Sequence, residues 1–256
     1  MTYRIDRRQA LATFGAVSLS GLLAACGDDR DSSNAVTTTD GTTSTVETKA
    51  STPTSLSKLF DDAASCSVTP EETEGPYYFD VDSIRSDIRE DREGLLLRLA
   101  LRVRDAKSCE PIENAVVDIW HCDAVGLYSG FESASTGGPG GGRTDEETYL
   151  RGAQATNADG VVEFRTVYPG WYGGRTVHIH AKVHLDKKTV LTSQLFFDEQ
   201  VSEVVYKRAP YSQRTGRETF NDTDGIFNEA LLVSARKQGD GYLALMTFDV
   251  QRASAT

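Results

Sequence analysis

Alternating apolar and polar positions are the main feature of the chain from about residue 56 onward. Between positions 97 and 104, every odd position is leucine or valine, and three of the four even positions are arginine. Because side chains two residues apart on an extended strand share a face, this alternation predicts a strand that is buried on one side. Alternating or continuous apolar runs predict five further strands, at residues 116–122, 161–168, 177–185, 191–197 and 242–250.

Helical patterns are few. We expect one short helix at residues 57–64, whereas residues 228–236 fit a helix or a strand equally well. A run of serine, glycine and proline at residues 133–142 predicts a mobile loop. Several strands separated by turns, with little helix, indicate an all-β fold, and we expect an antiparallel β-sandwich with long active-site loops. Residues 55–256 are long enough to form one such domain with a substantial core.

The first 26 residues have the features of an export signal. Arg7 and Arg8 precede an apolar run at residues 11–25, which is typical of a twin-arginine signal and too short to span a bilayer core of about 30 Å. The run ends in Leu-Ala-Ala-Cys at Cys26, which resembles the bacterial lipobox, whose cysteine is acylated and becomes the first residue of the mature protein. We therefore expect an exported protein that a lipid on Cys26 anchors at the cell envelope, on the extracytoplasmic side. The alternative is an ordinary signal that ends in a cysteine by chance.

Residues 27–54 are rich in serine, threonine and aspartate and contain almost no side chains that could form a core. Such a segment cannot offset its ordering entropy by burial, so we expect a flexible linker between the lipid and the domain. The formal net charge of the chain is −11. This acidic balance argues against nucleic-acid binding and against a basic membrane-binding patch, which leaves the lipid as the predicted membrane contact.

Three cysteines lie in the predicted domain, in a compartment that permits disulfides. Cys66 and Cys109 lie in loop-like sequence, whereas Cys122 falls within an apolar strand pattern. We expect a disulfide between Cys66 and Cys109 and a buried thiol at Cys122. The other two pairings remain open.

The sequence His178-Ile179-His180 lies within the predicted strand at residues 177–185. Residues two apart on a strand share a face and lie about 6.6 Å apart, so both histidines can approach one metal ion at about 2.1 Å. The opposite face of the strand, with Val177, Ile179 and Ala181, is apolar and can pack into the core of a sandwich. The alternative is a pair of surface histidines on an edge strand.

This spacing does not select the metal. Zinc enzymes, cupins and copper–zinc superoxide dismutases also use the His-x-His pattern. The chain contains four histidines, too few for a two-metal histidine site, and the other two are His121 and His184. The remaining metal ligands must therefore come from another residue type.

Four blocks of the chain resemble the intradiol catechol dioxygenases, and they occur in the order found in that family. The similarity extends over about residues 66 to 200 and is most specific where a Pro-Gly-Trp-Tyr-Gly-Gly-Arg sequence runs into the histidine pair. The blocks are Thr73–Tyr78, Val117–Ser129, Leu150–Thr156 and Pro169–His180.

The resemblance implies that a non-haem ferric ion, Fe(III), is bound by Tyr128, Tyr172, His178 and His180. It also implies that Tyr172 leaves the ion and accepts a proton when substrate binds. Tyr168 is the rival ligand, although its place at the end of an apolar strand favours a packed aromatic. Two phenolates and a hydroxide would offset the three positive charges of the ion, which suits a partly dry pocket.

The reaction implied by the resemblance is the cleavage of a catechol-type aromatic diol by dioxygen to a cis,cis-muconate-type diacid. Arg175 matches the arginine that stabilises negative charge developing on the substrate ring. Gln194 matches a supporting glutamine. The alternatives are a surface salt bridge for Arg175 and a structural role for Gln194.

Two other functions stay open. One is a non-catalytic β-sandwich lipoprotein that binds phenolics or glycans, and the other is a zinc or copper enzyme that uses the histidine pair. The better-known cytoplasmic relatives have a helical dimerisation segment where this chain has its predicted signal and linker, so a homodimer is kept only as an option. The remaining polar and aromatic residues of the motifs are expected to be structural, at the rim or in the pocket wall: Tyr77, Tyr78, Asp118, His121, Asp123, Tyr149 and His184.

Overall fold

The computed structural model describes residues 35–37, 43–45, 54–60, 66–81, 83–135 and 142–252. The predicted signal with Arg7, Arg8 and Cys26 lies outside the described residues, as does much of the predicted linker, so export and acylation stay predictions. Within the linker segment, β1 (Ala35–Thr37) and β2 (Thr43–Thr45) pair as a small antiparallel sheet. Among the described helices, none combines the length and the apolar character that crossing a membrane requires.

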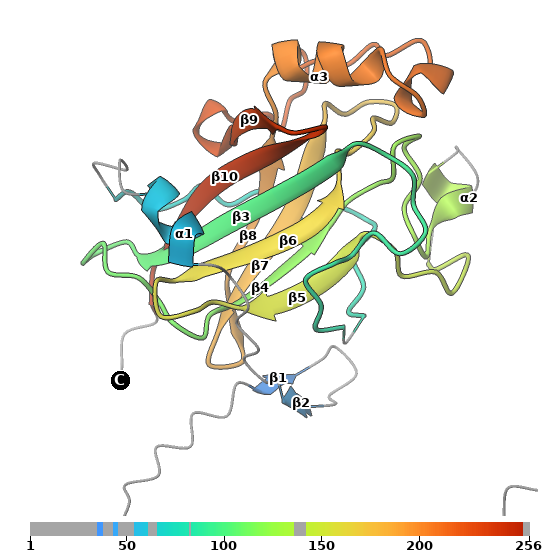
Figure 1. Cartoon of the computed structure of the whole chain (residues 1–256). Helices are drawn as coiled ribbons and strands as arrows, with labels where there is room; N and C mark the ends of the chain where they lie inside the picture. Colours follow the sequence, from blue (N-terminus) through green and yellow to red (C-terminus); the bar gives the residue numbers. More distant parts are fainter. Residues whose placement is uncertain are drawn as a thin grey trace, which may run out of the picture. The chain divides into compact units, whose positions relative to one another are not determined.

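Two four-stranded sheets pack face to face, which confirms the predicted β-sandwich (Figure 1). The first sheet has the order β6 (Val161–Val167), β3 (Leu96–Asp105), β10 (Gly241–Val250) and β9 (Ser234–Gln238). The second has the order β5 (Arg151–Ala155), β4 (Val116–Trp120), β7 (His178–Leu185) and β8 (Lys188–Phe196).

All neighbouring strands of the two sheets are antiparallel except β3 and β10, which are parallel. All six strands expected from the apolar pattern are present. The pattern missed β5, which contains glycine, alanine and glutamine, and included only the beginning of β9, which is mostly polar and exposed, within the ambiguous segment 228–236.

The main core lies between the two sheets and follows the alternation in the sequence. On β3, the four odd positions between 97 and 103 are fully buried in this core, and on β7 the core-facing residues are Ile179, Ala181 and Val183. The even positions of β7 must therefore lie on the opposite face, directed away from the other sheet. That outer face carries both histidines of the His-x-His pair.

A short helical segment covers the outer face of the first sheet. It consists of α1 (Thr54–Ser57) and the 3₁₀ turn η1 (Lys58–Phe60), and Figure 1 shows it in front of β3. Its Leu56 and Phe60 pack with Ala100, Val161 and Leu243 in a second, smaller core. The helix begins three residues before the predicted start at residue 57, and residues 61–64 lie outside the described residues.

The other helices are short. They are α2 (Glu132–Ser135), α3 (Glu199–Tyr206) and the 3₁₀ turns η2 (Tyr211–Gln213) and η3 (Glu229–Leu231). The ambiguous segment at residues 228–236 divides into η3 and the beginning of β9. Asp198 caps α3, because its side chain accepts a hydrogen bond from the amide of Gln200 at 2.7 Å.

The cysteines are arranged as predicted. Cys66 and Cys109 form a disulfide with their Cα atoms 5.5 Å apart, and Cys122 is a free, buried thiol. The disulfide joins the segment that precedes residue 70 to the connection between β3 and β4. The segment that follows Cys66 is therefore fixed covalently to the domain at its beginning.

Candidate metal centre

His178 and His180 lie side by side on the outer face of β7 and are almost completely buried, with exposed fractions of 2% and 1%. The strand register places Trp120 of β4 on one side of His180 and Gln194 of β8 on the other. Loops cover this face of the sheet, which explains how two histidines that point away from the core are still excluded from solvent. The edge-strand alternative does not hold, because β7 is an inner strand between β4 and β8.

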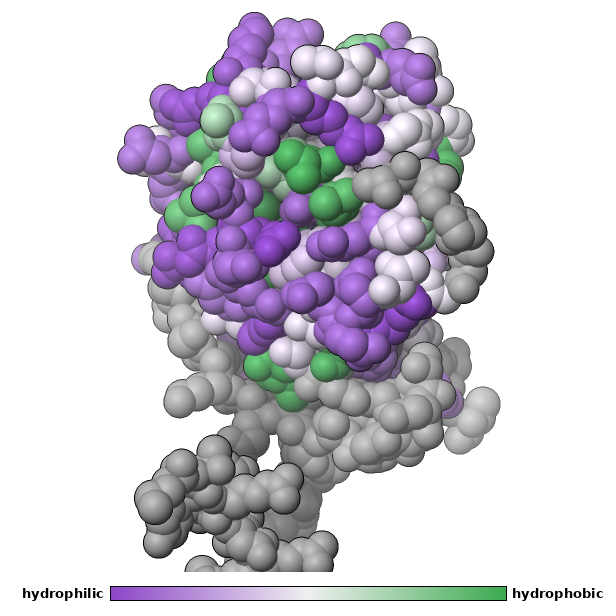
Figure 2. All heavy atoms as spheres, turned by 90° about the vertical axis from the view of Figure 1, so that its right-hand side faces the viewer, coloured by the Kyte–Doolittle hydropathy of each residue, from purple (hydrophilic) through white to green (hydrophobic). Residues whose placement is uncertain are grey.

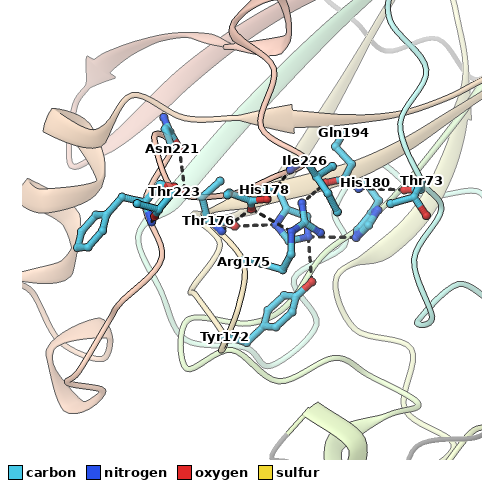
Figure 3. A network of polar contacts seen from close by, with 12 residues as sticks. Thr73, Tyr172, Arg175, Thr176, His178, His180, Gln194, Asn221, Thr223 and Ile226 are labelled. Atoms are coloured by element: carbon cyan, nitrogen blue, oxygen red, sulfur yellow. Dashed lines mark hydrogen bonds and ion pairs between the residues drawn. The ribbon is translucent and has the colours of Figure 1, made fainter.

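The two tyrosines come from loops, Tyr128 from the loop after β4 and Tyr172 from the loop before β7. The hydroxyl oxygens of Tyr172 and Tyr128 lie 3.1 Å and 3.4 Å from Nε2 of His178. Nε2 of His180 lies 3.1 Å from the same atom. Figure 3 shows Tyr172, His178 and His180 directed toward one another. The structure thus brings together all four of the residues implied as metal ligands.

The protonation of the histidines suits metal binding. Nδ1 of His178 lies 2.7 Å from the carbonyl oxygen of Thr176, so Nδ1 carries the hydrogen and Nε2 presents a free lone pair. Burial, together with the nearby Arg175, lowers the pKa of His178 to about 3, and burial and His178 lower the pKa of His180 well below its ordinary value. Both rings are therefore neutral, which is the form that binds metals.

Burial raises the pKa of Tyr128 and of Tyr172 above the ordinary value of a phenol. In the protein alone these hydroxyls therefore keep their protons. A bound cation has the opposite effect, because an adjacent positive charge favours the ionised form. Metal binding at this position would release protons from the tyrosines.

The distances fit a single ion. Two ligands that lie about 2.1 Å from one ion at a right angle are about 3 Å apart, and the three separations around Nε2 of His178 are 3.1, 3.1 and 3.4 Å. Two imidazole nitrogens at this distance need a proton or a cation between them. Nδ1 of His180 is buried and has no hydrogen-bond partner. Two nitrogens and two phenolic oxygens form a hard donor set that suits ferric iron.

Among the described residues, no carboxylate or thiol joins His178 and His180 to form a metal site. In the described part of the chain, no group of three or more histidine, cysteine, aspartate and glutamate side chains is arranged to bind a metal. The described side-chain oxygens that approach Nε2 of His178 belong to Tyr128 and Tyr172.

The ring of His180 is held between an indole and a glycine. Trp120 stacks on it with 4.9 Å between the ring centroids and an interplanar angle of 6°. A Cβ atom added to Gly75 would lie 3.2 Å from Cε1 of His180, and Gly75 has a φ of +73°, where a side chain is strained. Gly75 is thus one point at which the block Thr73–Tyr78 touches the candidate centre.

Arg175 and Gln194 lie beside the four ligands and contact each other. Nη2 of Arg175 donates to Oε1 of Gln194 at 2.5 Å, and Nε2 of Gln194 donates to the carbonyl oxygen of Thr73 at 2.9 Å. The Arg175 side chain is only 14% exposed, so it is not the surface salt bridge considered as its alternative. Figure 3 shows its guanidinium beside the histidine rings.

Asp224 is a part of this network that the sequence patterns did not indicate. One of its carboxylate oxygens, Oδ2, accepts from Nε of Arg175 at 2.9 Å and from the amide of Thr176 at 2.7 Å. Burial alone would raise the pKa of Asp224, but the amides of Ile226 and Thr176 and the charge of Arg175 outweigh it and lower the pKa. Asp224 lies in a polar stretch outside the four motif blocks, where no local pattern separates it from its exposed neighbours.

Tyr168, the rival ligand, lies in the core. Its hydroxyl is 2.8 Å from Oγ of Ser202, and its ring packs 4.7 Å from that of Phe197. The other expected structural residues also have protein partners. His121 contacts the carbonyl oxygen of Cys122 and the hydroxyl of Thr166, both at 2.7 Å.

Tyr77 stands at the wall of the centre, as expected, with its ring centroid 4.7 Å from that of Tyr128 and 6.2 Å from that of Tyr172. Nδ1 of His184 lies 3.1 Å from the hydroxyl oxygen of Thr189, and this contact is separate from the four candidate ligands.

Part of the loop 133–142 lies outside the described residues. Figure 2, viewed from the side on which α2 lies in Figure 1, shows a mostly hydrophilic face with a small hydrophobic group near its centre.

Asp118 is a buried carboxyl on the outer face of β4. Burial and the neighbouring Asp80 raise its pKa to about 7, although the hydroxyl of Tyr78 and the charges of Arg151 and Lys182 act in the opposite direction. The folded protein therefore holds a proton at Asp118 between about pH 4 and pH 7 that the unfolded chain has lost.

This difference predicts a pH dependence of stability. Because the folded state binds more protons in this window, the contribution of Asp118 to the free energy of unfolding falls as the pH rises from about 4 to 7. The Asp118→Asn variant has no proton to lose, so its free energy of unfolding relative to the native chain should increase across the same window. Urea unfolding of both proteins at several pH values measures this difference. Parallel pH profiles would contradict the assignment.

Comparison with known proteins places the chain in a family. The family model described as "Dioxygenase" matches residues 73–215. The solved intradiol ring-cleavage dioxygenase from Tetranychus urticae is 36% identical, with a TM-score of 0.69, and the match covers 73% of this chain and 95% of that chain. The dioxygenase domain of a dioxygenase carbohydrate-binding protein fusion from Streptomyces sp. SirexAA-E is 31% identical, with a TM-score of 0.55 and coverages of 73% and 100%.

A curated relative gives a similar result. Catechol 1,2-dioxygenase 1 of Acinetobacter lwoffii is 30% identical over 171 residues, which are 57% of this chain and 51% of the relative. The chain thus spans about half the length of this relative. The family match at residues 73–215 includes the two tyrosines, the histidine pair, Arg175 and Gln194. The chain belongs to the intradiol ring-cleaving dioxygenase family.

Proposed function

We propose that the protein is a non-haem ferric dioxygenase that cleaves a catechol-type aromatic diol between its two hydroxyl-bearing carbons. Dioxygen is the second substrate and a cis,cis-muconate-type diacid is the product. The observation that carries the proposal is the meeting of two phenolic oxygens and His180 Nε2 within 3.4 Å of His178 Nε2. The name of the Acinetobacter lwoffii relative, a catechol 1,2-dioxygenase, supports a catechol-type substrate.

The ion would be held by Tyr128, Tyr172, His178 and His180. When bound, ferric iron supplies the Lewis acidity that activates the diol toward dioxygen. The two tyrosines differ in a way that supports different roles, because Tyr128 is completely buried whereas Tyr172 is partly exposed. We assign to the Tyr172 oxygen the acceptance of a proton from the incoming diol, and to Tyr128 a permanent position in the site.

Arg175 supplies positive charge next to these groups, where negative charge develops on the substrate ring. Its guanidinium is held on one side by the Asp224 carboxylate and on the other by the side-chain oxygen of Gln194. An arginine fixed in this way needs no reorganisation during the reaction. Gln194 acts through Arg175 and is a positioning residue in this scheme.

The cellular location is part of the same proposal. Arg7, Arg8 and Cys26 support export and anchoring through a lipid, and the Cys66–Cys109 disulfide agrees with an oxidising compartment. The net charge of −11 argues against nucleic acid as a partner.

Visible spectroscopy tests the proposed function. Protein loaded with ferric iron should show a red-brown tyrosinate-to-iron band that shifts when catechol is added, and should consume oxygen while forming a diacid. Protein loaded with zinc is the matched control and should be colourless and inactive. A folded protein that remains colourless after iron loading, or one that binds catechol without consuming oxygen, would contradict the proposal in favour of a zinc or copper enzyme or a binding protein.

A further inference from the structure

Residues 70–80, called here the strap, cross the outer face of the second sheet from β8 toward β5. At the β8 end, the carbonyl oxygen of Pro70 accepts from Oγ of Ser193 at 2.8 Å, and the amide of Glu72 donates to the carbonyl oxygen of Thr192 at 2.9 Å. The side-chain amide of Gln194 donates a hydrogen bond to the carbonyl oxygen of Thr73. This end of the strap is thus hydrogen-bonded along the strand.

The middle of the strap forms one wall of the candidate metal centre. Gly75 lies against the ring of His180, and Tyr77 lies over Tyr128 and Tyr172. A shift of residues 75–77 would therefore change the space next to the side chains that are proposed to bind iron and substrate.

The far end of the strap packs on aromatic and cationic groups. The ring of Phe79 lies 4.2 Å from the guanidinium carbon of Arg151 and 5.8 Å from the ring of Phe131. Arg151 is itself buried on β5. Both ends of the strap are therefore attached to the sheet. The middle of the strap needs a contact of its own to keep its position against the candidate centre.

Lys182 provides such a contact. It lies on the outer face of β7 two residues after His180, opposite Asp118 of β4, and its residue is 8% exposed. Its Nζ forms an ion pair with the carboxylate of Glu74 and lies 3.5 Å from the centroid of the Tyr78 ring. The same amine is 6.0 Å from the ring of Trp120, which stacks on His180.

The positions of the two partners matter. Glu74 and Tyr78 bracket residues 75–77, the part of the strap that touches the centre. A lysine is rarely buried unless it is paired, because its charge loses hydration. Here the amine is compensated by the carboxylate of Glu74 and the aromatic face of Tyr78, and both belong to the strap.

We propose that Lys182 is a positioning residue, which holds Glu74 and Tyr78 so that residues 75–77 keep their place against His180 and the two tyrosines and shape the substrate pocket. The kinetic part of this inference rests on the proposed function. The structural part does not, because it concerns the attachment of the strap to β7.

The test uses the Lys182→Met variant of the full chain, in which the methionine keeps an apolar stem but loses the charge. Backbone hydrogen exchange of residues 70–80 in the metal-free protein should become about 10-fold faster, while exchange in β3 and β10 stays unchanged. In the iron-loaded protein, KM for catechol should rise about 10-fold with kcat changed less than about threefold, because no ligand is altered. Lys188→Met, at an exposed position at the start of β8, is the matched control and should change neither quantity.

Glu74→Gln provides a second route if Lys182→Met does not fold. It leaves the lysine in place, removes one of its two strap contacts and should shift strap exchange and KM in the same direction. Unchanged strap exchange together with an unchanged KM in the folded variants would overturn the inference. If the native protein shows no iron band and no turnover, the proposed function fails, and hydrogen exchange alone then decides the role of Lys182.

Discussion

Replacing Tyr128 with phenylalanine should lower turnover of catechol by more than about 100-fold. The magnitude follows from metal sites in general, where loss of a group that only supports a ligand already costs about 10- to 100-fold. Tyr128 is fully buried and its hydroxyl lies 3.4 Å from Nε2 of His178, so phenylalanine keeps the packing and removes one ligand atom. The visible band should weaken and shift, because one of the two tyrosinates that produce it is lost.

Tyr168→Phe is the matched control for this experiment. Tyr168 is equally buried, but its hydroxyl contacts Ser202 and not the histidine pair, and the variant loses this hydrogen bond. It should keep the iron band and the turnover and lose about 1 kcal/mol of stability. A Tyr128→Phe variant that retains both its band and its turnover, or a Tyr168→Phe variant that loses them, would contradict the assignment of ligands.

The second large effect is expected at Asp224. Both carboxylate oxygens are used, since Oδ2 accepts from Arg175 and from the Thr176 amide, while Oδ1 accepts from the amide of Ile226 at 2.8 Å. In Asp224→Asn, one of these oxygens becomes an NH₂ group that must face a donor. The free energy of unfolding should fall by about 3 kcal/mol, because the buried side of Arg175 loses its counter-charge.

The same change should lower kcat/KM by about 10- to 100-fold, since Arg175 and the carbonyl oxygen of Thr176, which accepts from His178, both lose support. Steady-state oxygen uptake and thermal or urea unfolding measure the two effects. Asp222→Asn, an exposed neighbour two positions away, is the control and should leave both unchanged. Full activity in folded Asp224→Asn would show that Arg175 does not depend on this carboxylate.

The strands and the histidine pair were predictable because they depend on neighbours in the chain. Alternation between positions 97 and 104 determines which face of β3 is buried, and the same period places His178 and His180 on one face of β7. The strand β5 was missed and β9 was left open between helix and strand, because their residues are small or polar and obtain their strand conformation from pairing with β4 and β10. The parallel pairing of β3 with β10 leaves no mark on either strand's local pattern.

The tyrosines needed more than periodicity. Tyr168 and Tyr172 are four residues apart on either side of a Pro-Gly pair, and the motif resemblance favoured Tyr172. Only the folded chain separates them, because Tyr168 directly follows β6 and is buried in the core, whereas the loop after Pro169 turns Tyr172 toward His178. The disulfide between Cys66 and Cys109 was inferred from loop context and compartment, and the structure confirms it.

The sequence by itself determined the sandwich class, the inward and outward faces of its strands, and the residue types that meet at the candidate centre. Tertiary structure alone decided the surroundings of that centre: Asp224 on Arg175, Trp120 and Gly75 on either side of His180, and Lys182 beneath the strap. The physical reason is the range of the forces involved. Burial of alternate positions is repeated at every second residue and can be read locally, whereas a single ion pair or stacking contact joins segments tens of residues apart and exists only once the loops are folded over the sheet.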